Sequence, residues 1–99
     1  MSARKFRKKP VVIEAVQWTG DNAAEVHELT GVDYFAPIED GFTHESDNPD
    51  VTATVLDVLH DTWVGVKTGQ WVIKGVKGEF YPIDEQVLAD TYESVEDAA

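Results

Sequence analysis

Two lysines and three aromatic residues gather in residues 69–82 (GQWVIKGVKGEFYP), within a chain that is otherwise strongly acidic. Lys74 and Lys77 supply positive charge, and the backbone amides of a glycine-bounded turn between them can hold a phosphate or carboxylate. An aromatic ring can stack on a base or on another ring. The candidates for that role are Trp18, Trp71 and Tyr81. Together these five residues would suit a nucleotide-like anion.

The same residues also have a structural explanation. Aromatic side chains at alternate positions of a strand are typical of a hydrophobic core. The two lysines can pair with Glu79 and Glu14, and the glycines can serve the dihedral angles of a turn. We therefore expect residues 69–82 to form a structural hairpin first, and a binding surface only second.

Motifs for catalysis or metal binding are scarce. The three histidines, His27, His44 and His60, fall on different predicted elements, and the absence of cysteine excludes disulfides and thiolate chemistry. Residues 47–50 (DNPD) place oxygen ligands close together, but without the glycine and the terminal glutamate of a calcium loop. The sequence predicts a non-enzymatic protein with no catalytic residue, no metal and no cofactor.

The charge is divided unevenly along the chain. Five basic residues stand within the first nine positions, and they form a candidate arm for contacting a partner: Arg4, Lys5, Arg7, Lys8 and Lys9. The remaining residues hold three lysines against all nineteen acids. An acidic body repels phosphate backbones, so we do not expect nucleic-acid binding.

The length of 99 residues fits one domain. We predict a basic arm over residues 1–10, a single α+β domain over 11–95 and a frayed tail over 96–99. No apolar run approaches the roughly 18 residues that a membrane helix needs, and the basic N-terminus lacks the apolar core of a signal peptide. We therefore expect no membrane partner and a protein that stays in the compartment where it is made.

The apolar pattern predicts an antiparallel meander of five to six strands with two short helices. Residues 11–18 are dense in β-branched side chains and apolar on both faces, which favours a strand in the interior of the sheet. A capped helix follows and ends at Gly31. Further strands are predicted at 52–59, 62–67, 71–74 and 79–83, then a helix that starts at Asp84, and a last strand from Thr91. Dimerisation of the chain would protect the exposed edges of such a sheet.

Two stretches resemble a known family. Residues 5–20 (KFRKKPVVIEAVQWTG) and 73–82 (IKGVKGEFYP), followed by TYE at 91–93, are similar to a family of small proteins encoded by tailed bacteriophages and prophages. Relatives often carry Pro-Gly-Asp-Tyr where this chain has residues 68–71 (TGQW). They also tend to be shorter, which implies that the acidic stretch 39–50 is an elaboration of this chain.

The resemblance implies a phage gene product that acts in the cytoplasm of an infected bacterium, and it assigns no catalytic residue. The leading hypothesis is an accessory protein that binds and modulates a host protein. One alternative is a module that sequesters a nucleotide-like anion from host defence. A second alternative is a minor component of the virion or of its assembly.

Overall fold

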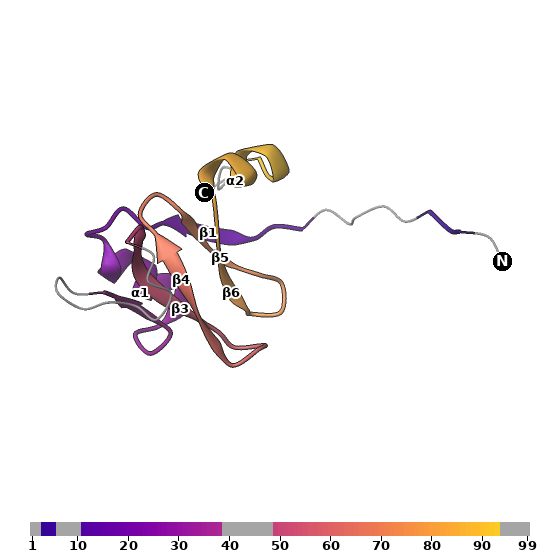
Figure 1. Cartoon of the computed structure of the whole chain (residues 1–99). Helices are drawn as coiled ribbons and strands as arrows, with labels where there is room; N and C mark the ends of the chain where they lie inside the picture. Colours follow the sequence, from indigo (N-terminus) through magenta and orange to yellow (C-terminus); the bar gives the residue numbers. More distant parts are fainter. Residues whose placement is uncertain (1–2, 6–10, 39–48, 94–99) are drawn as a thin grey trace, which may run out of the picture.

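The computed structural model describes residues 3–5, 11–38 and 49–93, and these form an α+β domain (Figure 1). The described part of the chain holds six strands and two short helices, as the α+β prediction requires. In chain order they are β1 (Glu14–Gln17), α1 (Ala23–Thr30), β2 (Phe35–Pro37), β3 (Val51–Asp57), β4 (Thr62–Lys67), β5 (Trp71–Lys74), β6 (Phe80–Ile83) and α2 (Glu85–Thr91).

The strands form two antiparallel sheets of three. Sheet I has the order β1-β5-β6, and sheet II has the order β2-β3-β4. The hairpins β3–β4 and β5–β6 are local, but β1 pairs with β5 across more than fifty residues, with Ala15 opposite Ile73. The expected single meander is thus split, because the chain passes from sheet II to sheet I between β4 and β5.

The core lies between the inner faces of the two sheets and α1. Trp18 is 1% exposed, and its ring meets that of Phe35 edge to face at 5.1 Å between centroids. The other members of the core are Val26, Ala53, Val55, Val66, Val72 and Phe80. Burial of these apolar side chains, roughly 1.5–3 kcal/mol for each fully buried valine or phenylalanine, holds sheets I and II together.

The helix predicted to end at Gly31 is α1. Its buried residues are Val26 and Thr30, one turn apart on the face toward the core. Gly31 ends the helix with φ 94, a conformation that favours glycine. Asn22 stands at the N-cap position, but its side chain accepts a bond from the Thr19 amide at 2.9 Å instead of capping the helix.

Two predictions about the ends of the chain are wrong. The apolar segment 11–18 gives the short strand β1 at an edge of sheet I, and not an interior strand. Its side chains are apolar on both faces because Val16 packs on the core while Ala15 faces the opposite side, toward α2. No strand begins at Thr91, because α2 continues through that residue. The predicted arm is described only at 3–5, and the predicted tail lies outside the described residues.

Candidate functional site

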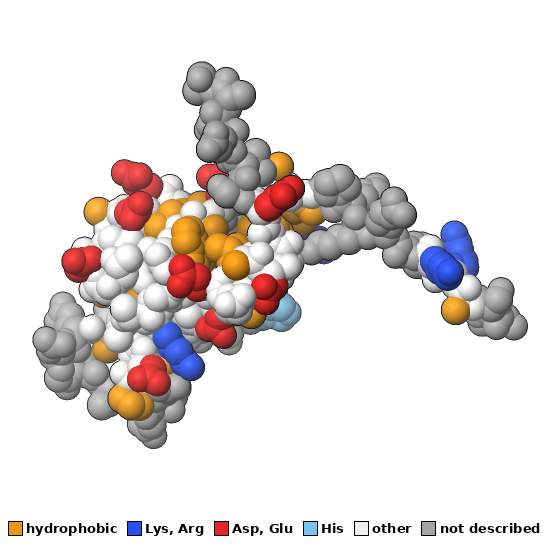
Figure 2. Space-filling model, turned by 90° about the horizontal axis from the view of Figure 1, so that it is seen from above, with side chains coloured by type: hydrophobic (Ala, Val, Ile, Leu, Met, Phe, Trp, Pro, Cys, Tyr) orange, Lys and Arg blue, Asp and Glu red, His pale blue; other side chains and the backbone are white. Residues whose placement is uncertain are grey.

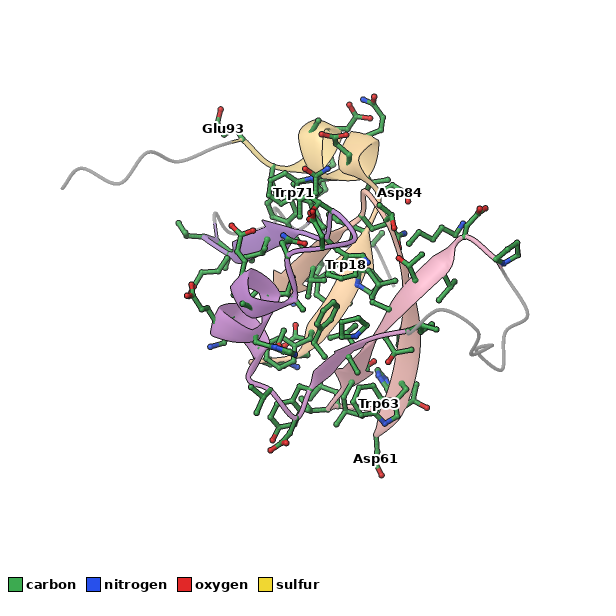
Figure 3. The ribbon with its side chains drawn as sticks, turned by 90° about the vertical axis from the view of Figure 1, so that its left-hand side faces the viewer. Trp18, Asp61, Trp63, Trp71, Asp84 and Glu93 are labelled. Atoms are coloured by element: carbon green, nitrogen blue, oxygen red, sulfur yellow. The ribbon has the colours of Figure 1, made fainter. Side chains whose placement is uncertain are left out.

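Trp18 does not offer a stacking surface. Its ring is enclosed in the core, and its indole Nε1 donates a hydrogen bond to Thr52 Oγ1 at 2.8 Å. The structural explanation therefore holds for this tryptophan. Sheet I separates Trp18 from Trp71 (Figure 3). On strand β5, Val72 faces the core, and the neighbouring residue Trp71 therefore points to the other side of the sheet.

The turn between β5 and β6 is already filled by a carboxylate of the chain itself. Glu79 Oε2 accepts a hydrogen bond from the Lys77 amide at 2.9 Å. The amides of Gly75 and Gly78 donate to backbone carbonyls at 2.8 and 3.0 Å. A Cβ atom on Gly75 would displace the Glu79 carboxylate, so glycine allows this close approach. Glu79 thus occupies the place where the predicted anion would bind.

The two lysines of the predicted anion site lie apart from its aromatic residues. Lys74 is exposed at the end of β5, on the same side of the strand as Val72, and Lys77 is exposed in the turn. Trp71 and Tyr81 both belong to the outer face of sheet I, where the register places Ile73 opposite Tyr81. The structure therefore brings together two of the five predicted residues and separates the other three from them.

The outer face of sheet I is covered by α2, which forms a further layer above the sheet in Figures 1 and 3. Ile73, at the centre of this face, is fully buried. No residue of α2 itself is buried. The helix therefore shields the sheet without embedding any side chain of its own, and little apolar burial opposes its displacement.

Contacts just outside the two ends of α2 fix it over the sheet. At its N-terminal end, Gln70 Nε2 donates to Asp84 Oδ1 at 2.9 Å. At its C-terminal end, the hydroxyls of Tyr81 and Tyr92 share a hydrogen bond. Burial raises the pKa of the Tyr81 hydroxyl, and the neighbouring Tyr92 and Glu79 add to this shift. Tyr81 therefore stays neutral at physiological pH and helps to anchor the end of the helix.

A pocket of about 630 Å³ lies between the segment leading into β1 and α2, over Trp71. We call it the Trp71 pocket. Its size is within the range of about 300–1,000 Å³ that is usual for ligand sites. In the described part of the chain its lining is mainly apolar, with three glutamates and neither lysine nor arginine: Val11, Val12, Ile13, Glu14, Ala15, Trp71, Glu85, Leu88, Ala89, Tyr92 and Glu93. Figure 2 shows hydrophobic side chains gathered on the side of the molecule that carries α2, with acidic side chains around them.

The indole N–H of Trp71 has no hydrogen-bond acceptor among the described residues, although its nitrogen is shielded from solvent. An unpaired buried donor of this kind costs about 1–3 kcal/mol. Trp18 is the internal contrast, because its indole N–H is paired with Thr52. The outer face of sheet I therefore holds a donor that an incoming acceptor would satisfy once α2 or the ring moves.

Sequence reasoning missed most of this pocket. Its walls come from residues 11–15 and 85–93, which are distant in the chain, and only the fold brings them together. One signal was present in the sequence: Val11 and Val12 are apolar beside a basic arm, and Val12 proves to be 77% exposed. Apolar residues left at the surface in a cluster mark binding surfaces.

The remaining predicted residues fall elsewhere. Arg4 and Lys5 are exposed, and Arg7, Lys8 and Lys9 lie outside the described residues, as does most of the acidic stretch 39–50. Across residues 3–5, 11–38 and 49–93, no group of three or more His, Asp or Glu side chains could hold a metal ion. No helix in the same ranges is long and apolar enough to cross a membrane.

A second exposed apolar cluster lies at the tip of the β3–β4 hairpin, at the far end of the domain from Trp71 in Figure 3. Val58, Leu59 and Trp63 are each more than two-fifths exposed there. Asp57 organises the turn, with its carboxylate accepting bonds from the Leu59 amide at 3.1 Å and from His60 Nδ1 at 2.7 Å. The bond from His60 lowers the pKa of Asp57.

Comparison of the chain with protein-family models, with curated proteins and with solved structures finds no match.

Proposed function

We propose that the protein is a non-enzymatic binding protein whose binding site is the Trp71 pocket. In the setting implied by the phage resemblance, it acts in the host cytoplasm by binding and modulating a host protein. The observation that carries the proposal is the unpaired, shielded indole N–H of Trp71 beside an apolar pocket. A binding partner that brings a hydrogen-bond acceptor would offset the free-energy cost of the unpaired Trp71 N–H, and an apolar group of the partner would cover the apolar lining.

The position of α2 supports this role. The helix lies over the pocket, is bonded at its ends through Asp84 and Tyr92, and buries none of its own residues. A cover of this kind can shift at low cost, because few apolar contacts are lost when it moves. Binding would then draw on the apolar surface of sheet I, including Trp71 and Ile73.

Small-ligand binding is the second candidate, and the size of the pocket favours it. The charge of the lining argues for a neutral or cationic ligand and against the nucleotide-like anion. Glu85 and Glu93 would repel a phosphate, and the Glu79 carboxylate already occupies the turn amides. A role in the virion or its assembly is a further proposal, which mass spectrometry of purified particles tests.

Affinity capture from host lysate tests the leading proposal. Ala89→Arg places a bulky charge in the pocket at an exposed helix position, so it should abolish capture without unfolding the domain. Gln86→Arg is the matched control, because it adds the same charge to the exposed side of α2 outside the pocket. Capture by the wild type and by Gln86→Arg, but not by Ala89→Arg, is expected. Equal capture by all three would contradict the proposal.

The basic arm is tested in the same experiment. A variant with alanine at Arg4, Lys5, Arg7, Lys8 and Lys9 separates partner contact through the arm from contact through the pocket. If the pocket carries binding, the arm variant still captures the partner. If capture follows the arm and ignores Ala89→Arg, the pocket is not the binding site.

A further inference from the structure

We propose that the occupant of the Trp71 pocket is a basic peptide segment of the partner protein. In this segment one bulky apolar side chain enters the pocket, and the flanking lysines or arginines pair with the acidic rim. This inference rests on the proposed function and names the chemistry of its partner. Three properties of the pocket carry it: its charge, its apolar lining and its unpaired donor.

The charge of the rim is of one sign. Glu85 and Glu93 border the pocket, and neither carboxylate makes an ion pair or hydrogen bond with another described residue. Glu14 also contributes to the lining, but its side chain lies on the Val16 side of β1, opposite Lys74. Among the described residues, the lining holds no basic side chain. Exposed ion pairs are individually weak, about 0.2–1 kcal/mol, but a one-signed rim steers a basic partner and rejects an acidic one.

The apolar lining selects a bulky side chain between those charges. Val11, Ile13 and Leu88 provide aliphatic walls, and Trp71 provides an aromatic one. Leucine, phenylalanine or methionine would fill part of such a space and exclude water from it. Apolar anchors of this kind, set within a polar rim, usually supply most of the binding energy of a protein interface.

The unpaired donor completes the match with a peptide. A peptide backbone presents a carbonyl oxygen at every residue, and the Trp71 indole N–H lacks an acceptor within the described part of the chain. The nitrogen is shielded in this conformation, so the bond forms with a shift of α2 or of the ring. A cationic apolar segment thus satisfies all three properties.

Titration calorimetry with synthetic peptides tests the inference on the full-length protein. The probe is a capped heptapeptide with a central leucine flanked on each side by a glycine spacer and two lysines. One control peptide has glutamate in place of each lysine, and another has serine in place of the leucine. The basic leucine peptide should bind at least about ten-fold more tightly than either control, as expected from several weak ion pairs and one apolar anchor.

A charge-neutral rim is the decisive protein variant. The double variant Glu85→Gln and Glu93→Gln should lower the affinity for the basic peptide by about ten-fold. Its matched control removes two exposed acids that do not line the pocket, with Glu28→Gln and Asp33→Asn, and should change the affinity by less than about three-fold. Circular dichroism of both double variants checks that they fold.

The outcomes separate the inference from the proposed function. Equal affinity for the basic and acidic peptides, or a loss of affinity that is the same in both double variants, overturns the assignment of a basic occupant. If the peptides do not bind while capture from lysate is still abolished by Ala89→Arg, the proposed function stands and this inference is wrong. If Ala89→Arg also leaves capture from lysate unchanged, both are wrong.

Discussion

Replacing Trp71 with phenylalanine should leave the free energy of unfolding unchanged or raise it, whereas the same replacement at Trp18 should lower it. The two tryptophans differ in one decisive respect. The indole N–H of Trp71 is shielded and has no acceptor in the described part of the chain, while that of Trp18 donates to Thr52 at 2.8 Å. An apolar ring removes the donor in both cases, and the consequences are opposite in sign.

The magnitudes follow from burial and hydrogen bonding. At Trp71, losing the unpaired donor relieves about 1–3 kcal/mol. The smaller ring costs about 1 kcal/mol of apolar burial. The net change is therefore an increase in stability of about 0–2 kcal/mol. At Trp18 the smaller ring costs at least about 1 kcal/mol, since a cavity forms in the core, and the lost bond to Thr52 costs about 1 kcal/mol more.

Urea denaturation followed by far-ultraviolet circular dichroism measures both changes without relying on tryptophan emission. A shift in midpoint with an unchanged slope reports stability directly. Each kcal/mol also corresponds to about 4–8 °C in Tm for a domain of this size. Should Trp71→Phe destabilise the protein as much as Trp18→Phe, the Trp71 N–H is paired after all, and the reasoning about the pocket is refuted.

Three further predictions concern the turns and the ends of α2. Glu79→Ala removes the carboxylate that accepts the Lys77 amide bond in the β5–β6 turn, so it should lower the free energy of unfolding by about 1 kcal/mol. Millimolar phosphate should then raise the Tm of this variant but not that of the wild type. His60→Ala should raise the pKa of Asp57 in a carboxyl NMR titration. Because the pKa of Asp57 is lowered in the folded protein, its contribution to stability is present at neutral pH and is lost on acidification. His60→Ala should weaken this acid dependence, and the amides that still bond to Asp57 should retain part of it. The pKa of Tyr81 is raised, so its contribution is lost as the pH rises beyond the ordinary tyrosine value of about 10; in absorbance titrations Tyr92→Phe should bring that pKa down.

Local patterns in the sequence were enough to predict the bounds of two strands and one helix. The strands β4 and β5 and the helix α1 have the bounds that their apolar periodicity and their flanking glycines predict. The reason is that each of these signals lies within the element or next to it. Gly31, for example, both breaks the pattern of α1 and adopts the positive φ that ends it.

Pairing between distant segments was not predictable in the same way. The segment 11–18 was apolar on both faces, which suggested an interior strand, but the cause is that sheet I is covered by the core on one face and by α2 on the other. Nothing local to residues 14–17 indicates which strand lies beside them or that a helix lies above them.

The candidate site was half predictable. Trp71 and Tyr81 stood out because of their residue types, and they do share the outer face of sheet I. Lys74 and Lys77 stood out because they are rare cations, but a count of charges does not show that Glu79 folds back onto the turn amides. The acidic rim escaped notice because acids are abundant everywhere in the sequence.

The indole N–H resonance of Trp71, observed by proton–nitrogen NMR during titration with the captured host partner, tests the binding site most directly. The resonance is assigned by its loss in Trp71→Phe. We predict a large downfield shift of the Trp71 signal as its N–H gains an acceptor, while the signal of Trp18, already bonded to Thr52, stays in place. A complex that forms with the Trp71 signal unmoved, or that shifts only the signal of Trp63 at the β3–β4 hairpin, would contradict the account.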